Sequence, residues 1–209
     1  MSSLTLYAFD TPNGRKISVA LEEMELPYTV QVIDITREEQ FDPAFLAISP
    51  NNKIPAIVDP QGPEGNPVSV FESGAILLYL AQKSGRFLPT DPRRRIQTWE
   101  WLMFQMGGFG PMPGQVHHFL QVDKPEDQRY GLQRYSRETR RLYSVMNRRL
   151  SEAPYFAEEA SIADFAILGW AWRHARHQVD LADYPHVHDW YARMMERPAT
   201  RRGFDVALR

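Results

Sequence analysis

The chain has 209 residues, of which 43% are hydrophobic and 24% charged, enough for one large domain or two small domains with buried cores. Its formal net charge of −2 argues against general binding of polyanions, and the absence of cysteine excludes disulfides, thiolate zinc sites and a catalytic thiol of its own. No basic and apolar leader stands at the start, and no apolar run reaches the ~20 residues that a membrane-spanning helix needs. We therefore expect a cytoplasmic protein with no membrane partner.

The charge is unevenly distributed along the chain. Residues 1–90 carry 6 Lys and Arg against 11 Asp and Glu, a net charge of −5, whereas residues 91–209 carry 18 against 15, a net charge of +3. Such a change of sign indicates two units with different surfaces. The segment "GRFLPTDP" at 85–92 is the candidate linker, so we expect domains at residues 1–86 and 93–209.

In the first part, short alternating apolar segments predict strands. The expected strands are residues 4–9, 28–33, 55–58 and 68–71. Apolar residues at helical spacing predict helices over residues 14–25 and 73–83, and residues 43–49 form a short helix or turn. The resulting order is a parallel strand–helix–strand unit followed by a hairpin and a helix, which is the thioredoxin-like pattern.

The second part has only helical periodicity. A long helix over residues 93–120 should be kinked or broken by the segment "GGFGPMPG" at 107–114. A second long helix over 127–150 should bury the apolar residues of one face, namely Leu132, Tyr135, Leu142 and Met146. Ser161 and Asp164 form a capping arrangement at the start of a third helix, and residues 185–195 form another. We therefore expect an all-helical C-terminal domain.

A strand runs directly into a helix at Glu72 and Ser73, and this junction is the first candidate site. The start of a helix offers backbone N–H groups and a partial positive charge, which attract a small carboxylate. The Glu72 carboxylate could pair with an ammonium group, and the two together describe the α-amino acid end of a ligand. Alternatively, Ser73 is only an N-cap and Glu72 only an acid that complements the helix dipole.

Several segments resemble one known family. The segments "NNKIPAIVD" at 51–59 and "VFESGAILLYLA" at 70–81 resemble the glutathione-binding half of cytosolic glutathione transferases. Others resemble the nu-class, YfcG-like disulfide-bond oxidoreductases of that family: "TPNGRKISVALEE" at 11–23, "GGFGPMPGQVHHF" at 107–119, "RYSRETRRLYSVMNRRL" at 134–150 and "SIADFAILGW" at 161–170. The resemblance covers nearly the whole chain. It implies a thioredoxin-like N-terminal domain, an all-helical C-terminal domain, and glutathione as the cosubstrate.

The resemblance also assigns roles to residues around glutathione. Glu72 would bind the γ-glutamyl ammonium and Ser73 the γ-glutamyl carboxylate, while the backbone of Ile54 would pair with the cysteinyl residue. Lys53, helped by Gln40, would bind the glycyl carboxylate. The backbone of Ile54 should be left available by a cis bond to the following proline, which the resemblance implies and the sequence alone does not. The alternative for Lys53 is a solvated lysine in a turn.

The glutathione thiol would lie beside the first loop, where a helix start and hydrogen bonds stabilise the reactive thiolate. We expect the hydroxyl and N–H of Thr11 and the amide of Asn13 to be its partners, although Asn13 could instead cap the helix. Asp10 is unsuited to this role, because an ionised carboxylate repels a neighbouring thiolate. Arg134 matches a subgroup arginine that reaches the glutathione of a neighbouring subunit, so we expect a homodimer; alternatively, Arg134 belongs to a solvated face.

The expected function is glutathione-dependent disulfide oxidation or reduction, with glutathione transfer to electrophiles and peroxide reduction as activities that the same thiolate could support. Since the chain has no cysteine, glutathione must supply the sulfur. The alternative is a non-catalytic glutathione-binding regulatory protein on the same fold. We expect no metal at the histidine pairs 117/118, 174/177 and 186/188, and no nucleic acid at the arginine-rich helix, where acids are interspersed.

Overall fold

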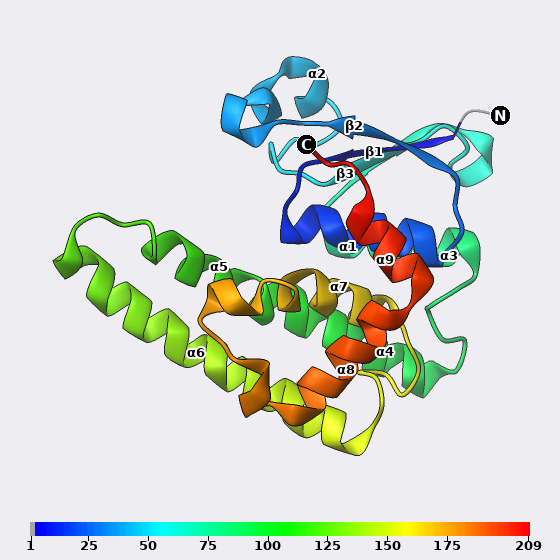
Figure 1. The fold of residues 1–209 in the computed structure, drawn as a ribbon. Helices are drawn as coiled ribbons and strands as arrows, with labels where there is room; N and C mark the ends of the chain where they lie inside the picture. Colours follow the sequence, from blue (N-terminus) through cyan, green and yellow to red (C-terminus); the bar gives the residue numbers. More distant parts are fainter. Residues whose placement is uncertain (1–2) are drawn as a thin grey trace. The chain divides into compact units, whose positions relative to one another are not determined.

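The computed structural model describes residues 3–209, which divide into two compact units (Figure 1). The first unit contains the residues up to Leu88 together with Met195–Arg209, and the second contains Pro89–Met194. The residues between the two expected domains, 87–92, therefore include the point where the chain leaves the first unit. The expected domain bounds, 1–86 and 93–209, stay a prediction.

The first unit is built on a sheet of four strands in the order β2-β1-β3-β4. Its strands are β1 (Leu4–Ala8), β2 (Tyr28–Val32), β3 (Ala56–Asp59) and β4 (Val68–Phe71). Strand β1 pairs in parallel with β2 and antiparallel with β3, and β3 pairs antiparallel with β4. The thioredoxin-like pattern predicted from the sequence is thus confirmed.

Helices α1 and α3 lie on one side of this sheet in Figure 1, and α2 lies beyond its other side. The helices of the first unit are α1 (Pro12–Glu23), α2 (Pro43–Leu46), α3 (Ser73–Ser84) and α9 (Pro198–Asp205), with 3-10 turns η1 (Ile35–Arg37), η2 (Glu39–Phe41) and η3 (Pro63–Gly65). The buried faces of α1 and α3 meet the inward side chains of the strands. The core includes Leu6, Ile17, Leu21, Ile57, Ile76 and Leu77.

Helix α9 packs against α1, although most of the chain separates them in sequence. Gly203 permits this approach, because a Cβ atom there would lie 2.5 Å from the Cα atom of Val19. The carbonyl of Gly203 accepts a hydrogen bond from the Ser18 hydroxyl at 2.7 Å. The end of the chain therefore buttresses the first helix, an arrangement that no local sequence pattern indicated.

The second unit is helical throughout its described secondary structure, apart from an isolated bridge between Ala157 and Glu159. Its helices are α4 (Pro92–Phe104), α5 (Pro111–Phe119), α6 (Pro125–Glu152), α7 (Ile162–Ala171) and α8 (Pro185–Glu196), with the π-helical turn η4 (Gln105–Phe109) and 3-10 turns η5 (His174–His177) and η6 (Leu181–Asp183). The predicted break of the first long helix is confirmed. It takes the form of a π-helical turn in which the Gly110 N–H donates to the Gln105 carbonyl at 2.8 Å.

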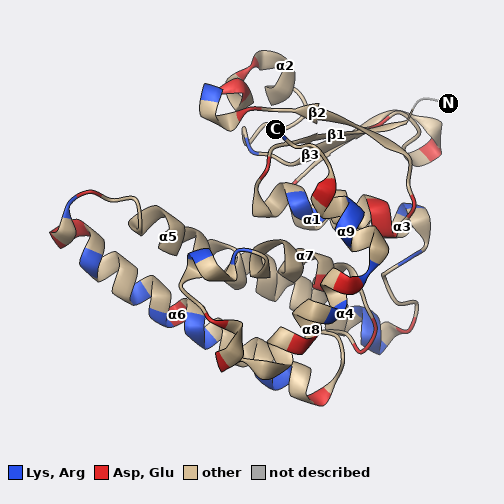
Figure 2. Ribbon diagram, in the orientation of Figure 1, with Lys and Arg blue, Asp and Glu red and all other residues tan. Residues whose placement is uncertain are grey.

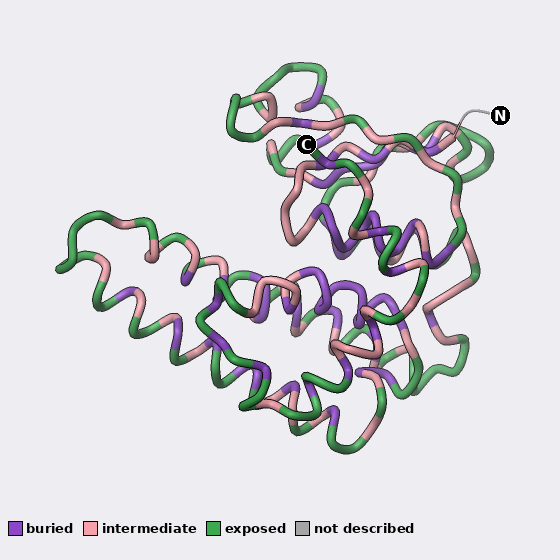
Figure 3. The backbone as a smooth tube through the Cα atoms, viewed as in Figure 1, coloured by how far each residue is buried: buried purple, intermediate pink, exposed green. Residues whose placement is uncertain are grey.

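The predicted capping arrangement at the start of α7 is also confirmed. The Ser161 N–H donates to the Asp164 carboxylate at 2.9 Å, and the buried carboxylate also accepts a hydrogen bond from the Trp190 indole at 2.9 Å. Helix α6 differs in part from the expectation. Leu142 and Met146 are buried, but Leu132 and Tyr135 are only half-buried. Figure 3 colours more residues of the first half of α6 as exposed or intermediate than of its second half.

Candidate functional site

The loop before α1 ends in a helix cap formed by Thr11. Its backbone is extended, with φ −127° and ψ 160°, and its hydroxyl accepts a hydrogen bond from the Gly14 N–H at 3.2 Å. The hydroxyl proton is thereby left to be donated to another group. Two sequence-based expectations need correction. Thr11, and not Asn13, caps the helix, and the Thr11 N–H is used internally because it donates to the Phe9 carbonyl at 2.7 Å.

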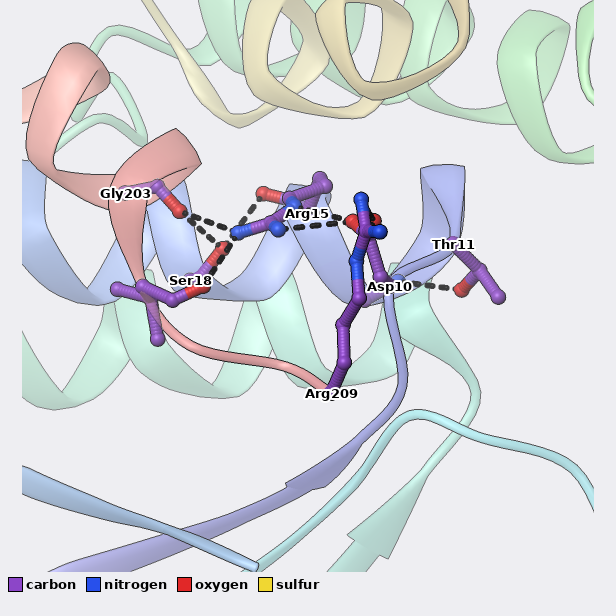
Figure 4. A network of polar contacts seen from close by, with 8 residues as sticks. Asp10, Thr11, Arg15, Ser18, Gly203 and Arg209 are labelled. Carbon is purple, nitrogen blue, oxygen red and sulfur yellow. Dashed lines mark hydrogen bonds and ion pairs between the residues drawn. The ribbon is translucent and has the colours of Figure 1, made fainter. Parts of the chain in front are cut away.

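Asp10 is neutralised by two arginines beside this loop (Figure 4). Its carboxylate lies 2.8 Å from Arg15 Nη2 and 2.7 Å from Arg209 Nη2, and Arg15 also donates to the carbonyl of Val206 at 2.8 Å. Burial opposes ionisation, but the hydrogen bonds and charges of the two arginines outweigh it and hold the pKa of Asp10 below its ordinary value. Asp10 therefore anchors the loop to the end of the chain, a role that the sequence did not reveal.

The start of α3 has an unusual backbone. Glu72 occupies the N-cap position with φ 68° and ψ 116°, a conformation that a residue other than glycine rarely adopts, and its side chain makes no capping hydrogen bond. Ser73 is the first residue of the helix and is buried. The Glu72 side chain therefore does not cap the helix, and its part as an acid near the helix dipole stays the alternative. Strain of this kind occurs disproportionately at ligand-binding positions.

Lys16 joins the two helix starts, and the sequence interpretation missed it. Its ammonium donates a hydrogen bond to the Ser73 hydroxyl oxygen at 3.1 Å, and the whole residue is only 1% exposed. Burial lowers the pKa of Lys16 to about 7, against the opposing field of the Glu72 carboxylate. The sequence does give one indication that Lys16 faces the interior. Lys16 lies one helical turn after Asn13 and one turn before the buried Ala20, on the same side of α1.

The segment before β3 leaves a short piece of backbone unpaired. The bond between Ile54 and Pro55 is cis, as the resemblance implied. Among the described residues, the N–H and C=O groups of Ile54 have no hydrogen-bond partner, although its side chain packs on the cluster of Ile33, Phe45 and Ala56. The Lys53 side chain is exposed, and its carbonyl accepts a hydrogen bond from the Ser49 hydroxyl at 2.8 Å. An extended ligand could therefore pair with Ile54.

Gln40 lies in the turn η2, where its side-chain oxygen Oε1 is buried without a partner in the described part of the chain. A buried acceptor without a donor is unfavourable, so a ligand or water is expected there. The structure thus brings Ser73 and Glu72 together with Lys16. The amide nitrogen of Asn51, in the loop before β3, lies 3.5 Å from the Glu72 carboxylate. In the described part of the chain, no hydrogen bond or ion pair joins the side chain of Gln40 or Lys53 to these residues.

Arg134 belongs to the second unit, where it lines a groove of about 850 Å³ between α5 and α6. Arg134 and Arg137 form no ion pair among the described residues, although the charge of Arg134 helps to lower the pKa of Glu138, after the hydrogen bond and charge of Arg141. Arg141 forms a bidentate pair with Glu138 at 2.7 and 2.8 Å. The lining residues are Met112, Tyr130, Gln133, Arg134, Tyr135, Arg137, Glu138 and Arg141. Figure 2 shows the basic residues spaced along α6. The groove can accept an anionic group.

Residues near the break of the first long helix divide between core and groove. Phe109 is fully buried and stacks against Phe104, with ring centroids 6.4 Å apart and an angle of 9° between the ring planes. It also meets the Tyr143 ring edge-on, so Phe109 is a core residue of the second unit. Met112 instead lines the groove.

The histidine pairs include one buried cluster. His117 and His177 stack with centroids 4.9 Å apart, and the Tyr143 hydroxyl lies 3.0 Å from His177 Nδ1. Burial is the main cause that lowers the pKa of His117 to about 4 and that of His177 to about 2, with the nearby positive charges of Arg173 and Arg176 adding to it. Among residues 3–209, no three His, Cys, Asp or Glu side chains are placed to hold a metal ion.

Within the same residues, no helix combines the length and the apolar composition that crossing a membrane requires.

Comparison with known proteins identifies relatives over the whole chain. Residues 11–83 match the glutathione S-transferase N-terminal domain family, and residues 112–198 match the corresponding C-terminal domain family. The chain is 50% identical to the disulfide-bond oxidoreductase YfcG of Escherichia coli over 199 residues, covering 94% of this chain and 92% of that protein.

Two crystal structures are closely similar in fold. A glutathione transferase from Pseudomonas putida, with one glutathione disulfide bound per subunit, has a TM-score of 0.92 and 46% identity, covering 98% of this chain and 91% of that chain. A family member from Pseudomonas fluorescens, with two glutathione molecules bound, has a TM-score of 0.93 and 42% identity, covering 98% of this chain and 93% of that chain.

Proposed function

Because the chain belongs to the glutathione S-transferase family, we propose that it is a glutathione-dependent disulfide-bond oxidoreductase that also transfers glutathione to electrophiles. The observation that carries the proposal is the pair of helix starts in the first unit. One is capped by Thr11 with its hydroxyl proton left over, and the other presents Glu72 and the buried Ser73. The name of the Escherichia coli relative and the ligands of the Pseudomonas structures support it.

Each part of glutathione then has a partner. Glu72 takes the ammonium and Ser73 the carboxylate of the γ-glutamyl group, while the unpaired backbone of Ile54 bonds to the cysteinyl residue. The Lys53 ammonium and the N–H groups of the Gln40 amide take the glycyl carboxylate. The Ile54 groups support its assignment, because they lack partners among the described residues.

The reaction uses the sulfur of glutathione throughout. The Thr11 hydroxyl and the Asn13 amide donate hydrogen bonds to the thiolate, and the N-terminus of α1 adds its partial positive charge. The thiolate attacks one sulfur of a disulfide; a glutathione mixed disulfide forms, and the other sulfur leaves as a thiolate that takes up a proton. A second glutathione thiolate then attacks the mixed disulfide, which yields glutathione disulfide and the second product thiol.

A homodimer is also part of the proposal. Helix α4 carries exposed apolar side chains at helical spacing, Ile96 at 53%, Trp99 at 43% and Met103 at 54% exposure, and such a stripe favours association with a second copy. The groove that holds Arg134 would face the glutathione of the partner. A cytoplasmic location fits, since thiols are kept reduced there.

Turnover of a small disulfide with reduced glutathione, coupled to a reductase that recycles glutathione disulfide, tests the proposal. The Asn13→Ala variant should lose about 10- to 100-fold in kcat/KM, as expected for loss of a hydrogen bond to a charged group. Asn66→Ala, at an exposed turn, is the matched control and should keep the wild-type rate. Glutathione binding without turnover by the unmodified protein would instead support the regulatory alternative, and an unchanged Asn13→Ala rate would remove Asn13 from the mechanism.

A further inference from the structure

The segment that follows α9 packs against the loop that presents Thr11. Leu208 of this segment is fully buried. Its Cδ1 atom would lie 3.5 Å from a Cβ atom at Gly14, the residue whose N–H donates to the Thr11 hydroxyl. The segment therefore lies directly behind the cap of α1, within the first unit.

Asp10, the residue before Thr11, is held by one guanidinium group on each carboxylate oxygen (Figure 4). Arg15 donates from Nε to Oδ1 at 2.9 Å, and its Nη2 lies 2.8 Å from the same oxygen. Arg209 donates from Nε to Oδ2 at 2.9 Å, and its Nη2 lies 2.7 Å from that oxygen. The carboxylate is thus fixed both from α1 and from the segment after α9.

Arg15 and Arg209 differ in their surroundings. The Arg15 side chain is only 7% exposed and also donates to the carbonyl of Val206 at 2.8 Å, so it belongs to the packing of α1. The Arg209 side chain is 79% exposed, and within residues 3–209 it forms no hydrogen bond or ion pair except with Asp10. An exposed arginine fills no space in the core, so its effect on the molecule acts through Asp10.

The charge of Asp10 matters for the proposed reaction, because Thr11 is one of the proposed donors to the glutathione thiolate. An ionised carboxylate close to that sulfur disfavours the thiolate and raises the pKa of the thiol. Asp10 stays ionised at neutral pH. Burial opposes this, but Arg15 and Arg209 outweigh burial and hold the pKa of Asp10 below its ordinary value. Arg209 therefore supplies one of the positive charges that offset this carboxylate.

We propose that Arg209 is a positioning residue for the proposed reaction: through Asp10 it holds the loop that presents Thr11, and it offsets the Asp10 charge beside the glutathione sulfur. This inference rests on the proposed function, since it needs the thiolate at Thr11. It gives a residue outside the proposed glutathione contacts an influence on the reactivity of the sulfur.

The helices around the loop carry other charged groups, all of which stay in place when Arg209 alone is replaced. A difference between the wild type and such a variant is therefore due to Arg209. Most of these groups have a neighbour of opposite charge: Lys16 with Glu72, Glu22 with Arg202, Glu23 with Arg197 and Lys83 with Asp59, while Arg201 and Asp205 of α9 are exposed.

The pKa of the glutathione thiol in the complex tests the charge effect, because a purely structural role would not move it. Ultraviolet absorbance of the thiolate, titrated from about pH 5 to 9, gives this pKa. Arg209→Gln should raise it by about half a pH unit. Arg209→Lys keeps the charge and should match the wild type. Arg201→Gln, the matched control, removes the same charge from α9 without an ion pair to Asp10 and should not change the thiol pKa.

Turnover of a small disulfide tests the positioning effect. At pH 6.5, Arg209→Gln should lose about three- to tenfold in kcat/KM, whereas Arg201→Gln should keep the wild-type value. The double variant Asp10→Asn/Arg209→Gln removes one charge of each sign. Its thiol pKa should return toward that of the wild type, while its kcat/KM should stay reduced because the loop has lost its ion pair to the segment after α9.

The outcomes separate the two proposals. An unchanged thiol pKa in Arg209→Gln, or an equal rise in Arg209→Gln and Arg201→Gln, overturns the charge effect of Arg209 and leaves the proposed function intact. A double variant with the wild-type kcat/KM overturns the positioning effect. A wild type that forms no thiolate complex with glutathione and does not turn over the disulfide contradicts the proposed function itself.

Discussion

Lys16 in the first unit and His177 in the second are both basic side chains that are only 1% exposed. Burial is the main reason that both have lowered pKa values. Their neighbours differ. Lys16 donates to a serine at a helix start and lies in the field of the Glu72 carboxylate. His177 lies among aromatic rings, and within residues 3–209 its ring hydrogen-bonds to the Tyr143 hydroxyl alone.

The difference shows why a perturbed pKa alone does not identify a site. Lys16 donates a hydrogen bond to Ser73, the residue at which the proposed site binds the carboxylate of glutathione. The Nε2 atoms of His117 and His177 have no partner in the described residues, and no third metal ligand stands near them. The histidine cluster therefore combines lowered pKa values with no site that the described residues form, whereas Lys16 lies beside the proposed site at Ser73.

The largest expected effect concerns the histidine cluster in acid. Since the folded-state pKa values are lowered, the unfolded chain takes up protons first, and stability is lost as the pH falls below about 6.5. Each histidine contributes up to about 1.4 kcal/mol per pH unit. In urea denaturation between pH 6.5 and 4.5, the double variant Tyr143→Phe/His177→Phe should remove about half of the histidine-dependent loss.

The double variant is chosen because replacing both partners of the Tyr143–His177 hydrogen bond leaves neither of them buried and unsatisfied. Asn66→Ala, at an exposed turn and with no titratable side chain, is the control and should not change the slope of stability against pH. An unchanged slope in the double variant would show that His177 does not resist protonation.

The next effect concerns what holds α1 in the first unit. Gly203→Ala would place a Cβ atom 2.5 Å from the Val19 Cα atom and 2.8 Å from its N atom, so α9 must move away. We expect a loss of about 2–4 kcal/mol in the free energy of unfolding. Gly107→Ala in the second unit is the matched control, since a Cβ atom there meets nothing within 4 Å. Equal stability of the two variants would contradict the tight α1–α9 contact.

A smaller effect of opposite sign is expected for Lys16→Met. The folded-state pKa of Lys16 is lowered to about 7, so the penalty is full below pH 7 and fades as the pH rises toward 10.5. The variant should be more stable by on the order of 1–3 kcal/mol at pH 7, since loss of the Ser73 hydrogen bond offsets only part of the removed penalty. This gain in stability should shrink at higher pH, where the buried amine is neutral. Thermal unfolding from pH 6.5 to 9.5 measures this. A variant that is less stable throughout would mean that the buried charge is not unfavourable.

The smallest effect concerns the cap of α1. Thr11→Ala removes the hydrogen bond to the Gly14 N–H and should cost about 1 kcal/mol of stability, while Thr11→Ser should retain the cap. Thr11→Ala should also lower the disulfide-reduction rate, as the thiolate loses one donor. If Thr11→Ser were as unstable as Thr11→Ala, the hydroxyl would not be the cap.

The sequence by itself determined the features that depend on neighbours along the chain. Alternation and helical spacing predicted the strands and helices, the Gly- and Pro-rich segment predicted the break after α4, and Ser161 with Asp164 predicted a cap. The junction at Glu72 and Ser73 was visible for the same reason, because a strand running into a helix leaves a recognisable local pattern.

Only the tertiary structure decided which distant residues meet. Nothing near Lys16 in the sequence shows that its ammonium reaches Ser73, 57 positions away, and nothing near Asp10 shows its pairing with Arg209. The approach of α9 to α1 depends likewise on a glycine at 203 and on the backbone of Val19. Such pairings arise because packing brings separate helices together, and the spacing of residues along the chain does not show which distant side chains then come into contact.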